Sequence, residues 1–226
     1  CLEGVKLAAE ELEKMTVTLN GETVSAPIDG WFTDRAIKTV PLPVIREGKN
    51  DLILTMPFGA RTNVEWCYLL GAFGVRVAGV KTTLTRLPDR IGFSDIVPQG
   101  MPFYGGNIRY DIPLTTEKTA DLTIRASSYK GALIAVRLDG KDVGRIVFPP
   151  YDLTVENVEK GAHTLQITVF GNRQNSFGPV HNVDLSNRWI GPPIWRTTGD
   201  AWCYEYKLTP FGLLKSPVIT LSEKEQ

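Results

Sequence analysis

Apolar and polar residues alternate along much of this chain, with the two-residue period of a strand that buries one face. Residues 164–169 read TLQITV, and residues 51–56 read DLILTM. In the second half of the chain, the pattern predicts strands near 107–114, 120–127, 132–138, 143–148, 163–170, 202–208 and 217–221. About seven short strands at regular turn spacing are typical of a β-sandwich or jelly roll, so the sequence predicts an all-β protein.

The same series of segments occurs twice. Residues 17–24 read VTLNGETV and residues 136–143 read VRLDGKDV, each with a two-residue hairpin signal, Asn-Gly or Asp-Gly. The stretch GKNDLILTMPFGARTN at 48–63 matches GAHTLQITVFGNRQN at 161–175. Trp-Cys-Tyr and then Phe-Gly follow in both halves. A repeat of this length predicts two copies of one domain.

The two copies differ in extent, and we expect domains at 1–92 and 93–226. The first begins inside the shared part and lacks the equivalent of about residues 96–119. A sandwich without this outer strand would have an unpaired edge and an uncovered core strip. The helix-like stretch 5–15 aligns with 124–134, so we interpret it as a strand pair with a polar turn.

Composition excludes several classes of protein. Hydrophobic residues make up 42% of the 226 residues, which indicates a globular chain. Lys plus Arg and Asp plus Glu both number 25, so no basic excess points to nucleic acid. No apolar run reaches the roughly 20 residues that a membrane span requires, and no signal peptide is visible. We favour a secreted or cell-surface location over a cytoplasmic one.

The cysteines and histidines are too few and too scattered for a metal centre. No Cys-x-x-Cys pair exists and there are two histidines, so we expect no metal site and no cofactor. Cys67 and Cys203 occupy equivalent places in the two copies. Equivalent positions in separate domains would not face each other, so we expect both to be buried free thiols.

These motifs resemble the galactose-binding-like jelly rolls of family 2 glycoside hydrolases and of rhamnosidase-type bacterial glycosidases. The resemblance lies in the hairpin and Gly-x-(Asn/His)-x-Leu patterns, and in the runs YLLGAFGV at 68–75, GMPFYGGN at 100–107 and RQNSFGPVH at 173–181. It implies two tandem jelly-roll (galactose-binding-like) β-sandwiches, the first incomplete. It also implies a non-catalytic part of a glycosidase-like protein, because the catalytic residues of such enzymes usually lie in another domain.

The second copy carries an insertion, residues 176–201, between Asn175 and Trp202, where the first copy has two residues between Asn63 and Trp66. Long loops in compact domains are commonly functional. Sugars require a flat aromatic ring and planar hydrogen-bonding groups. Residues found only in the second copy supply this mixture, and the candidate carbohydrate-binding set is Trp189, Trp195, His181, Asn182, Arg188, Tyr104 and Asn107. The alternative is that the tryptophans only anchor the loop.

Other interpretations of the chain stay open. The leading one is an accessory module that contacts carbohydrate or buttresses an adjacent catalytic domain, and the second is a structural interaction domain without a ligand. The third is a glycosidase that uses Asp184, Asp200 or Glu205, although these carboxylates are more typical of solvated surface positions. The shared Arg173 and Asn175 predict a structural role, in which they tie a loop back to the backbone.

Overall fold

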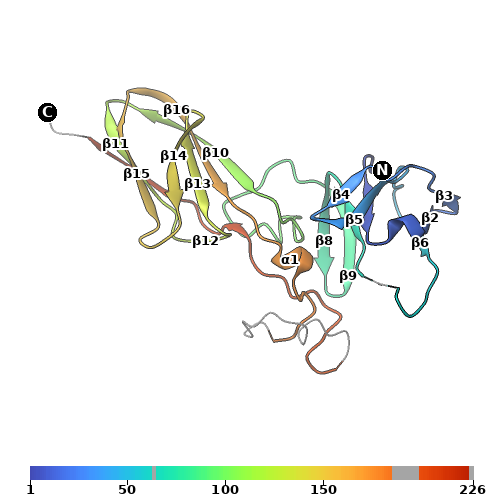
Figure 1. Cartoon of the computed structure of the whole chain (residues 1–226). Coiled ribbons are helices and arrows are strands. Elements are labelled where there is room, and N and C mark those ends of the chain that lie inside the picture. The colour runs from blue at the N-terminus through green and yellow to red at the C-terminus, as the bar shows by residue number, and fades with distance from the viewer. Residues whose placement is uncertain (63–64, 185–198, 224–226) are drawn as a thin grey trace. The chain divides into compact units, whose positions relative to one another are not determined.

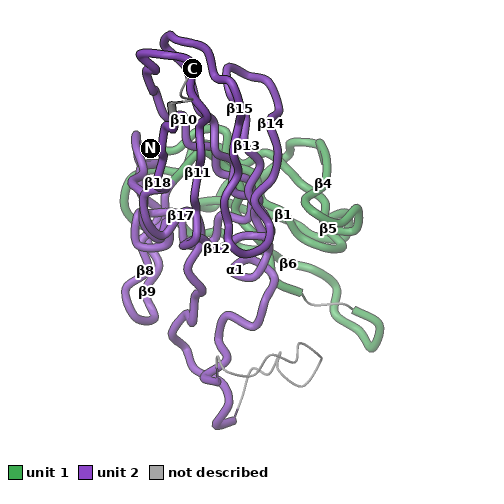
Figure 2. Tube along the Cα trace, turned by 90° about the vertical axis from the view of Figure 1, so that its left-hand side faces the viewer, with its two compact units in different colours: residues 1–73 green, residues 74–226 purple. Residues whose placement is uncertain are grey.

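The structure of the chain is a computed structural model that describes residues 1–62, 65–184 and 199–223. The chain divides into two compact units, Cys1–Phe73 (unit 1) and Gly74–Gln226 (unit 2), which Figure 2 draws in green and purple. Residues 74–92, predicted from the sequence to belong to the first domain, therefore lie in unit 2.

Both units are built from antiparallel sheets, which confirms the all-β prediction (Figure 1). In unit 1, one sheet has the strand order β4-β5-β1-β7 and the other β3-β2-β6. The strands are β1 (Lys6–Ala9), β2 (Thr16–Leu19), β3 (Glu22–Thr23), β4 (Gly30–Phe32), β5 (Asp34–Pro41), β6 (Leu52–Thr55) and β7 (Tyr68–Leu70). Their inward side chains form one core that includes Val5, Leu7, Leu12, Val17, Leu19 and Val40.

The stretch 5–15 was expected to form a strand pair with a polar turn, and this expectation is wrong. It forms one strand, β1, and a 3-10 turn, while β2 begins only at Thr16. β1 pairs with β5 and β7, whereas β2 pairs with β3 and β6 in the other sheet. Between them, the 3-10 turn η1 (Leu12–Lys14) carries the chain from one sheet to the other. Leu12 is buried in the core, and this burial fixes the crossing.

Unit 2 contains a four-stranded sheet of order β10-β16-β13-β14 and a three-stranded sheet of order β15-β11-β18. Two small sheets, β12-β17 and β8-β9, complete it, with β8 starting at Phe73. The strands are β8 (Phe73–Ala78), β9 (Lys81–Arg86), β10 (Ile108–Thr116), β11 (Ala120–Arg125), β12 (Tyr129–Lys130), β13 (Ile134–Leu138), β14 (Lys141–Ile146), β15 (Asp152–Val158), β16 (Gly161–Val169), β17 (Gly212–Leu213) and β18 (Val218–Glu223). Leu122, Ile124, Ile134, Leu165 and Ile167 are fully buried between the larger sheets.

One strand predicted for unit 2 does not form, and one strand of seven residues was missed. The sequence indicated a strand at 202–208, but this segment makes only an isolated bridge from Trp202 to Asn182. Conversely, β15 was not predicted, although it pairs with β11 along Asp152–Val158. The alternation of β15 is obscured because it follows the sequence FPPY at 148–151, whose prolines are typical of a loop.

The repeated sequence segments pair in the same register in the two units. Leu19 faces Leu52 in unit 1, and their aligned residues Leu138 and Leu165 face each other in unit 2. Both predicted hairpins form, and the Asn20-Gly21 and Asp139-Gly140 turns have positive φ at both residues. This is the type I′ geometry that Asn-Gly and Asp-Gly favour.

In both units, a similar set of side-chain contacts links the hairpin turn to the strand beside it. Asn20 Oδ1 accepts the amide of Asp51 at 2.9 Å, and Asn20 Nδ2 donates to Asn50 Oδ1 at 3.0 Å. Asn50 in turn donates to the Arg46 carbonyl at 2.8 Å. The turn residue, the strand and a preceding carbonyl are thereby held together.

Unit 2 repeats this arrangement with a histidine in place of Asn50. Asp139 Oδ1 accepts the Thr164 amide, and His163 contacts Asp139 Oδ2 through Nδ1 and the Glu159 carbonyl through Nε2, both at 2.8 Å. A carboxylate and a carbonyl both accept, so both ring nitrogens donate when the imidazole is protonated. These bonds raise the pKa of His163, with Asp139 the main cause, and lower the pKa of Asp139.

Because unit 2 has His163 where unit 1 has Asn50, we predict that its free energy of unfolding depends on pH through His163. The pKa of His163 is raised from its ordinary value of 6.5, so its stabilising contribution is complete below 6.5 and is lost as the pH rises through the folded-state pKa. In the His163→Asn variant, the asparagine reproduces the contacts of Asn50 without titrating. Urea unfolding followed from pH 6 upward should show a loss of stability in the wild type that is smaller in His163→Asn. Parallel pH profiles of the two proteins would contradict the role of His163.

The outer edge of β6 is open, as the sequence predicted. In unit 2, the equivalent strand β16 pairs with β10 on one side and β13 on the other. In unit 1, β6 pairs with β2, and no strand within the described ranges covers its second edge. As a result, Leu52 and Leu54 are only half-buried, whereas the aligned Leu165 and Ile167 are fully buried.

The cysteine prediction is half correct. All three cysteines are free, but Cys67 is exposed and Cys203 is half-buried, so the expected burial is wrong. Cys67 lies beside the opening left by the uncovered β6 edge.

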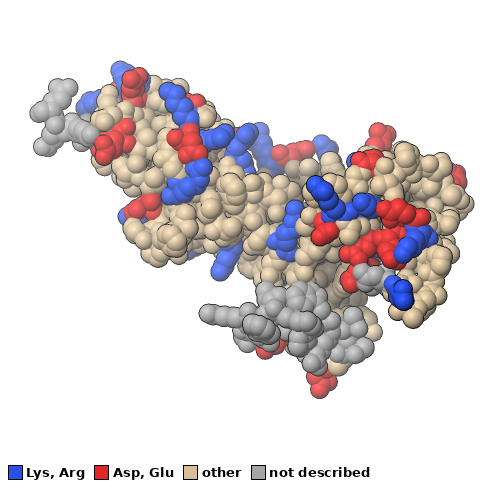
Figure 3. All heavy atoms as spheres, viewed as in Figure 1, with Lys and Arg blue, Asp and Glu red and all other residues tan. Residues whose placement is uncertain are grey.

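Basic and acidic side chains are interspersed on the described surface seen in Figure 3. The described helices include none that is both long and apolar enough for a bilayer crossing.

Candidate functional site

Four of the seven predicted site residues lie in described parts of unit 2. Arg188, Trp189 and Trp195 fall outside the described residues, so their predicted contact with carbohydrate stays a prediction. Tyr104, Asn107, His181 and Asn182 lie around the two ends of the insertion, and their contacts are given below.

The two ends of the insertion form an irregular antiparallel ribbon, residues 180–183 and 201–207, which we call the insertion base. The amide of Val183 donates to the Ala201 carbonyl, and the amide of Cys203 donates to the His181 carbonyl, both at 2.9 Å. The amide of Lys207 donates to the Val180 carbonyl at 2.6 Å. The ribbon therefore holds residues 184 and 199, the described limits of the insertion, at one place on unit 2.

Aromatic rings line the insertion base. His181 packs against Tyr206 with ring centroids 4.6 Å apart and against Trp202 at 5.4 Å. Trp202 meets Tyr204 edge to face at 4.5 Å, and 75% of Tyr204 is exposed. Because Trp202 fixes one edge of the Tyr204 ring, the other surfaces of that ring are presented to solvent in a defined orientation.

The histidine has a positioning role in this cluster. His181 Nδ1 lies 3.0 Å from the Cys203 carbonyl, which is an acceptor, so this nitrogen carries the proton and donates. The bond orients the ring between Trp202 and Tyr206. His181 thus contributes an aromatic wall to the insertion base.

Asn182, Tyr104 and Asn107 hold loops in place. Asn182 is buried, and its Oδ1 accepts the amide of Asp184 at 3.1 Å. The Tyr104 hydroxyl donates to the Asn107 carbonyl at 3.1 Å, and Asn107 Oδ1 accepts the Gly171 amide at 3.1 Å. The predicted polar groups of these three residues are therefore engaged in backbone contacts and position the neighbouring site.

The Asn107 contact brings two glycine segments close together. A Cβ on Gly171 would collide with the carbonyl oxygens of Gly105 and Gly106. Only glycine fits at 171, because the backbones of the two segments cross without room for a side chain. This glycine crossing fixes the point at which the chain leaves β16 toward the insertion.

A groove of about 700 Å³ lies next to the glycine crossing. Its lining combines one aromatic ring with amide, cationic and small side chains, namely Lys130, Gly131, Asn172, Arg173, Gln174, Phe177, Gly178, Thr209 and Pro210. Most of one wall comes from the short helix α1 (Gln174–Phe177) and its preceding residues. The Arg173 guanidinium carbon lies 6.0 Å from the centre of the Phe177 ring, a cation–π distance.

Asn175 ties this wall to the far side of the groove. Its Nδ2 donates to the Thr209 carbonyl at 2.9 Å, and its Oδ1 accepts both the Thr209 amide and the Thr209 hydroxyl. This confirms the structural role predicted for the shared asparagine. Ser176 adds a second tie, because its hydroxyl donates to the Phe103 carbonyl at 3.0 Å.

The sequence analysis did not identify the residues that form the groove at α1 and the aromatic surface of the insertion base. Gln174 and Phe177 belong to the run RQNSFGPVH, which was considered only for its resemblance to glycosidase jelly rolls. Trp202 and Tyr204 were not among the candidates, because Trp-Cys-Tyr occurs in both halves and the candidates were residues found only in the second copy. Yet Trp66 is 51% exposed in unit 1, so the motif places aromatic rings at the surface and not in a core.

The three carboxylates of the glycosidase alternative lie in different surroundings. The amide of Asp184 is held by Asn182, Asp200 is exposed, and Glu205 is paired with Lys207 at 3.4 Å. Within residues 1–62, 65–184 and 199–223, no three His, Cys, Asp or Glu side chains are grouped as a metal ion would require.

Comparison with known proteins gives distant structural matches only. No family model matches the chain, and neither does any curated protein. The rhamnosidase from Novosphingobium sp. PP1Y is similar over 96% of this chain and 22% of that protein, with 18% identity and a TM-score of 0.40. A GH2 β-galacturonidase from Eisenbergiella tayi matches 47% of this chain and 18% of its own, with 19% identity and a TM-score of 0.29.

A third match is a lectin from Pleurotus ostreatus, over 76% of this chain and 64% of that chain, with 11% identity and a TM-score of 0.26. This chain thus spans about a fifth of the length of the rhamnosidase and of the β-galacturonidase.

Proposed function

We propose that this chain is a non-catalytic accessory module of a glycosidase-like protein, and that its second unit contacts carbohydrate. In this proposal the two units are copies of one galactose-binding-like jelly roll, and the insertion adapts the second copy for binding. The matching registers around Asn20 and Asp139 support the duplication. The sequence resemblance to glycosidase jelly rolls supports the context.

The observation that carries carbohydrate contact is the exposed Tyr204 ring, oriented by Trp202 at the insertion base. Sugar rings stack their CH faces on such an aromatic surface and use planar polar groups for their hydroxyls. The groove at α1 offers Asn172, Gln174 and Lys130 for that purpose. Tyr206 packs against Phe103, whose carbonyl holds Ser176, so the insertion base and α1 are linked by direct contacts.

We expect Tyr204→Ala to weaken sugar binding by about tenfold, because loss of one stacking ring removes about 1.4 kcal/mol. The measurement is isothermal titration of the whole chain with mono- and oligosaccharides of rhamnose, galactose and galacturonic acid. Phe148→Ala is the control, since Phe148 is 78% exposed but lies in the turn after β14. No heat with any of these sugars, or equal affinities for the two variants, would refute the proposal.

A structural interaction role is the second candidate function. The observation that favours it is in unit 1, where the uncovered edge of β6 borders a partly apolar groove. A module that contacts a neighbouring polypeptide through this groove would show no response to sugars.

A further inference from the structure

We propose that unit 1 binds an extended strand of a partner polypeptide, which pairs with the outer edge of β6 and fills the groove beside it. The strand has alternating apolar residues and a basic residue at its amino-terminal end. This inference rests on the second candidate function, and its failure would leave carbohydrate contact by unit 2 untouched.

Unit 2 shows what an occupied edge looks like. There, β10 pairs with β16 over nine residues, from Ile108 opposite Val169 to Thr116 opposite Gly161. Alternate residues of β10, beginning with Ile108 and Tyr110, are buried against the core. The aligned strand in unit 1 is β6, whose Leu54 corresponds to Ile167. Met56 follows the end of β6 and corresponds to Val169.

The backbone of β6 has hydrogen-bonding groups available at this edge. The Asp51 carbonyl accepts the Asn20 amide, so Asp51 faces β2. Because successive residues of a strand direct their N–H and C=O groups to opposite sides, the groups of Leu52, Leu54 and Met56 face the open edge. A strand added there would extend the sheet, which is the usual mode of β-augmentation.

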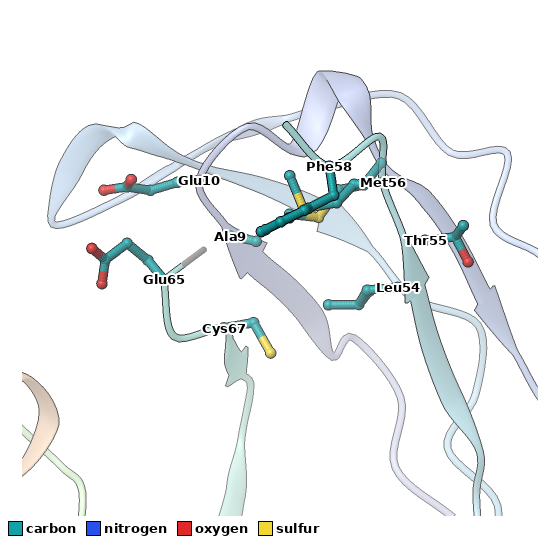
Figure 4. Close-up of a pocket in the computed structure, with 9 residues that line it drawn as sticks. Ala9, Glu10, Leu54, Thr55, Met56, Phe58, Glu65 and Cys67 are labelled. Atoms are coloured by element: carbon teal, nitrogen blue, oxygen red, sulfur yellow. The ribbon is translucent and has the colours of Figure 1, made fainter. Parts of the chain in front are cut away.

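The groove beside the edge has room for side chains of the added strand. Its volume is about 420 Å³, and its apolar lining comes from Ala9, Met15, Leu54, Met56 and Phe58 (Figure 4). Met15 and Met56 align with Ile134 and Val169, a pair that is fully buried in unit 2. In unit 1 both methionines are only half-buried. Flexible methionine side chains can adapt to different partners.

Charge at one end of the groove specifies the partner further. Glu10 and Glu65 line the same end, and Figure 4 shows their carboxylates on the same side of the opening. A strand antiparallel to β6, as β10 is to β16, has its amino-terminal end near Met56. A basic residue at that end would be attracted by Glu10 and Glu65.

The test uses a synthetic peptide consisting of lysine followed by residues 107–116 of this chain, titrated into the whole protein. We expect a dissociation constant of about 100 µM or lower by fluorescence anisotropy, with slower hydrogen exchange at the Leu54 and Met56 amides. Met56→Lys, which places a charge in the groove, should weaken binding at least tenfold. Ile53→Lys should not, because Ile53 is exposed on the opposite face of the same strand.

Three results would overturn the proposal. The first is no binding at about 1 mM peptide, far above the expected constant. The second is equal binding by Met56→Lys and wild type, which would place the peptide elsewhere, such as in exchange with β10 of unit 2. The third is a dimer of the free wild-type chain in sedimentation that Met56→Lys dissociates, which would make a second copy the occupant. Replacing the peptide lysine by glutamate should weaken binding, and no change would refute the role of the two carboxylates.

Discussion

Replacing Ile167 by alanine is expected to lower the free energy of unfolding of unit 2 by about 2–5 kcal/mol. Ile167 is fully buried between β10 and β13, so its deleted atoms would leave a cavity that neighbouring strands cannot close. The aligned substitution in unit 1, Leu54→Ala, removes a side chain that is already half-exposed. We expect that variant to lose only about 1–2 kcal/mol.

Hydrogen exchange is the appropriate measurement, because a chain with two compact units need not unfold in one step. Amides of β13 and β16 should exchange faster in Ile167→Ala, while amides of β2 and β6 should keep their rates. Equal destabilisation by the two substitutions would show that the β6 edge is covered in solution by something that acts as β10 does in unit 2.

Replacing Asn175 by alanine is expected to destabilise the groove wall by about 2–3 kcal/mol. Asn175 is buried and makes three hydrogen bonds to Thr209, so the substitution leaves the Thr209 amide and carbonyl without these partners. Half-buried backbone groups that lose their hydrogen bonds each carry a penalty of about 1–3 kcal/mol.

The Thr209 amide reports this effect directly through its exchange rate, and sugar binding should weaken in parallel because α1 forms one wall of the groove. Asn172→Ala is the matched control for the exchange rate only, because Asn172 is one of the groove residues proposed to meet sugar hydroxyls. Asn172 is exposed and its Oδ1 accepts the Gln174 amide at 3.0 Å, so its loss should change stability by less than about 1 kcal/mol. An unchanged Thr209 exchange rate in Asn175→Ala would contradict the anchoring role.

The sequence was most informative where one local rule determines geometry. Asn20-Gly21 and Asp139-Gly140 predicted their hairpins because few residues other than Asn, Asp and Gly adopt positive φ in both turn positions. The hairpin then fixed the register of the next strand, and the alternation in β6 and β16 identified the inward face. The open edge of β6 followed from the absence of a segment equivalent to β10 in the first half.

The site was less predictable because it depends on contacts between distant segments. Asn107 has the residue type of a sugar site, but its Oδ1 accepts the amide of Gly171, which only the fold brings near. Tyr104 and Asn182 make local contacts instead, with the Asn107 carbonyl and the Asp184 amide. Tyr204 lies in a motif shared by both halves, so it fell outside the candidates, which were residues found only in the second copy. Its exposure arises because the insertion base carries it away from the sheets as an irregular ribbon.

The glycine crossing and the Asn175–Thr209 ties fasten the chain on both sides of the insertion. We therefore expect the register of β16 to be independent of the sequence between these two anchor points. Evolution, or an engineer, can exchange the sequence between these two anchor points while the scaffold remains the same. Under the proposed function, a change of sugar specificity would then require a new loop sequence and no new fold.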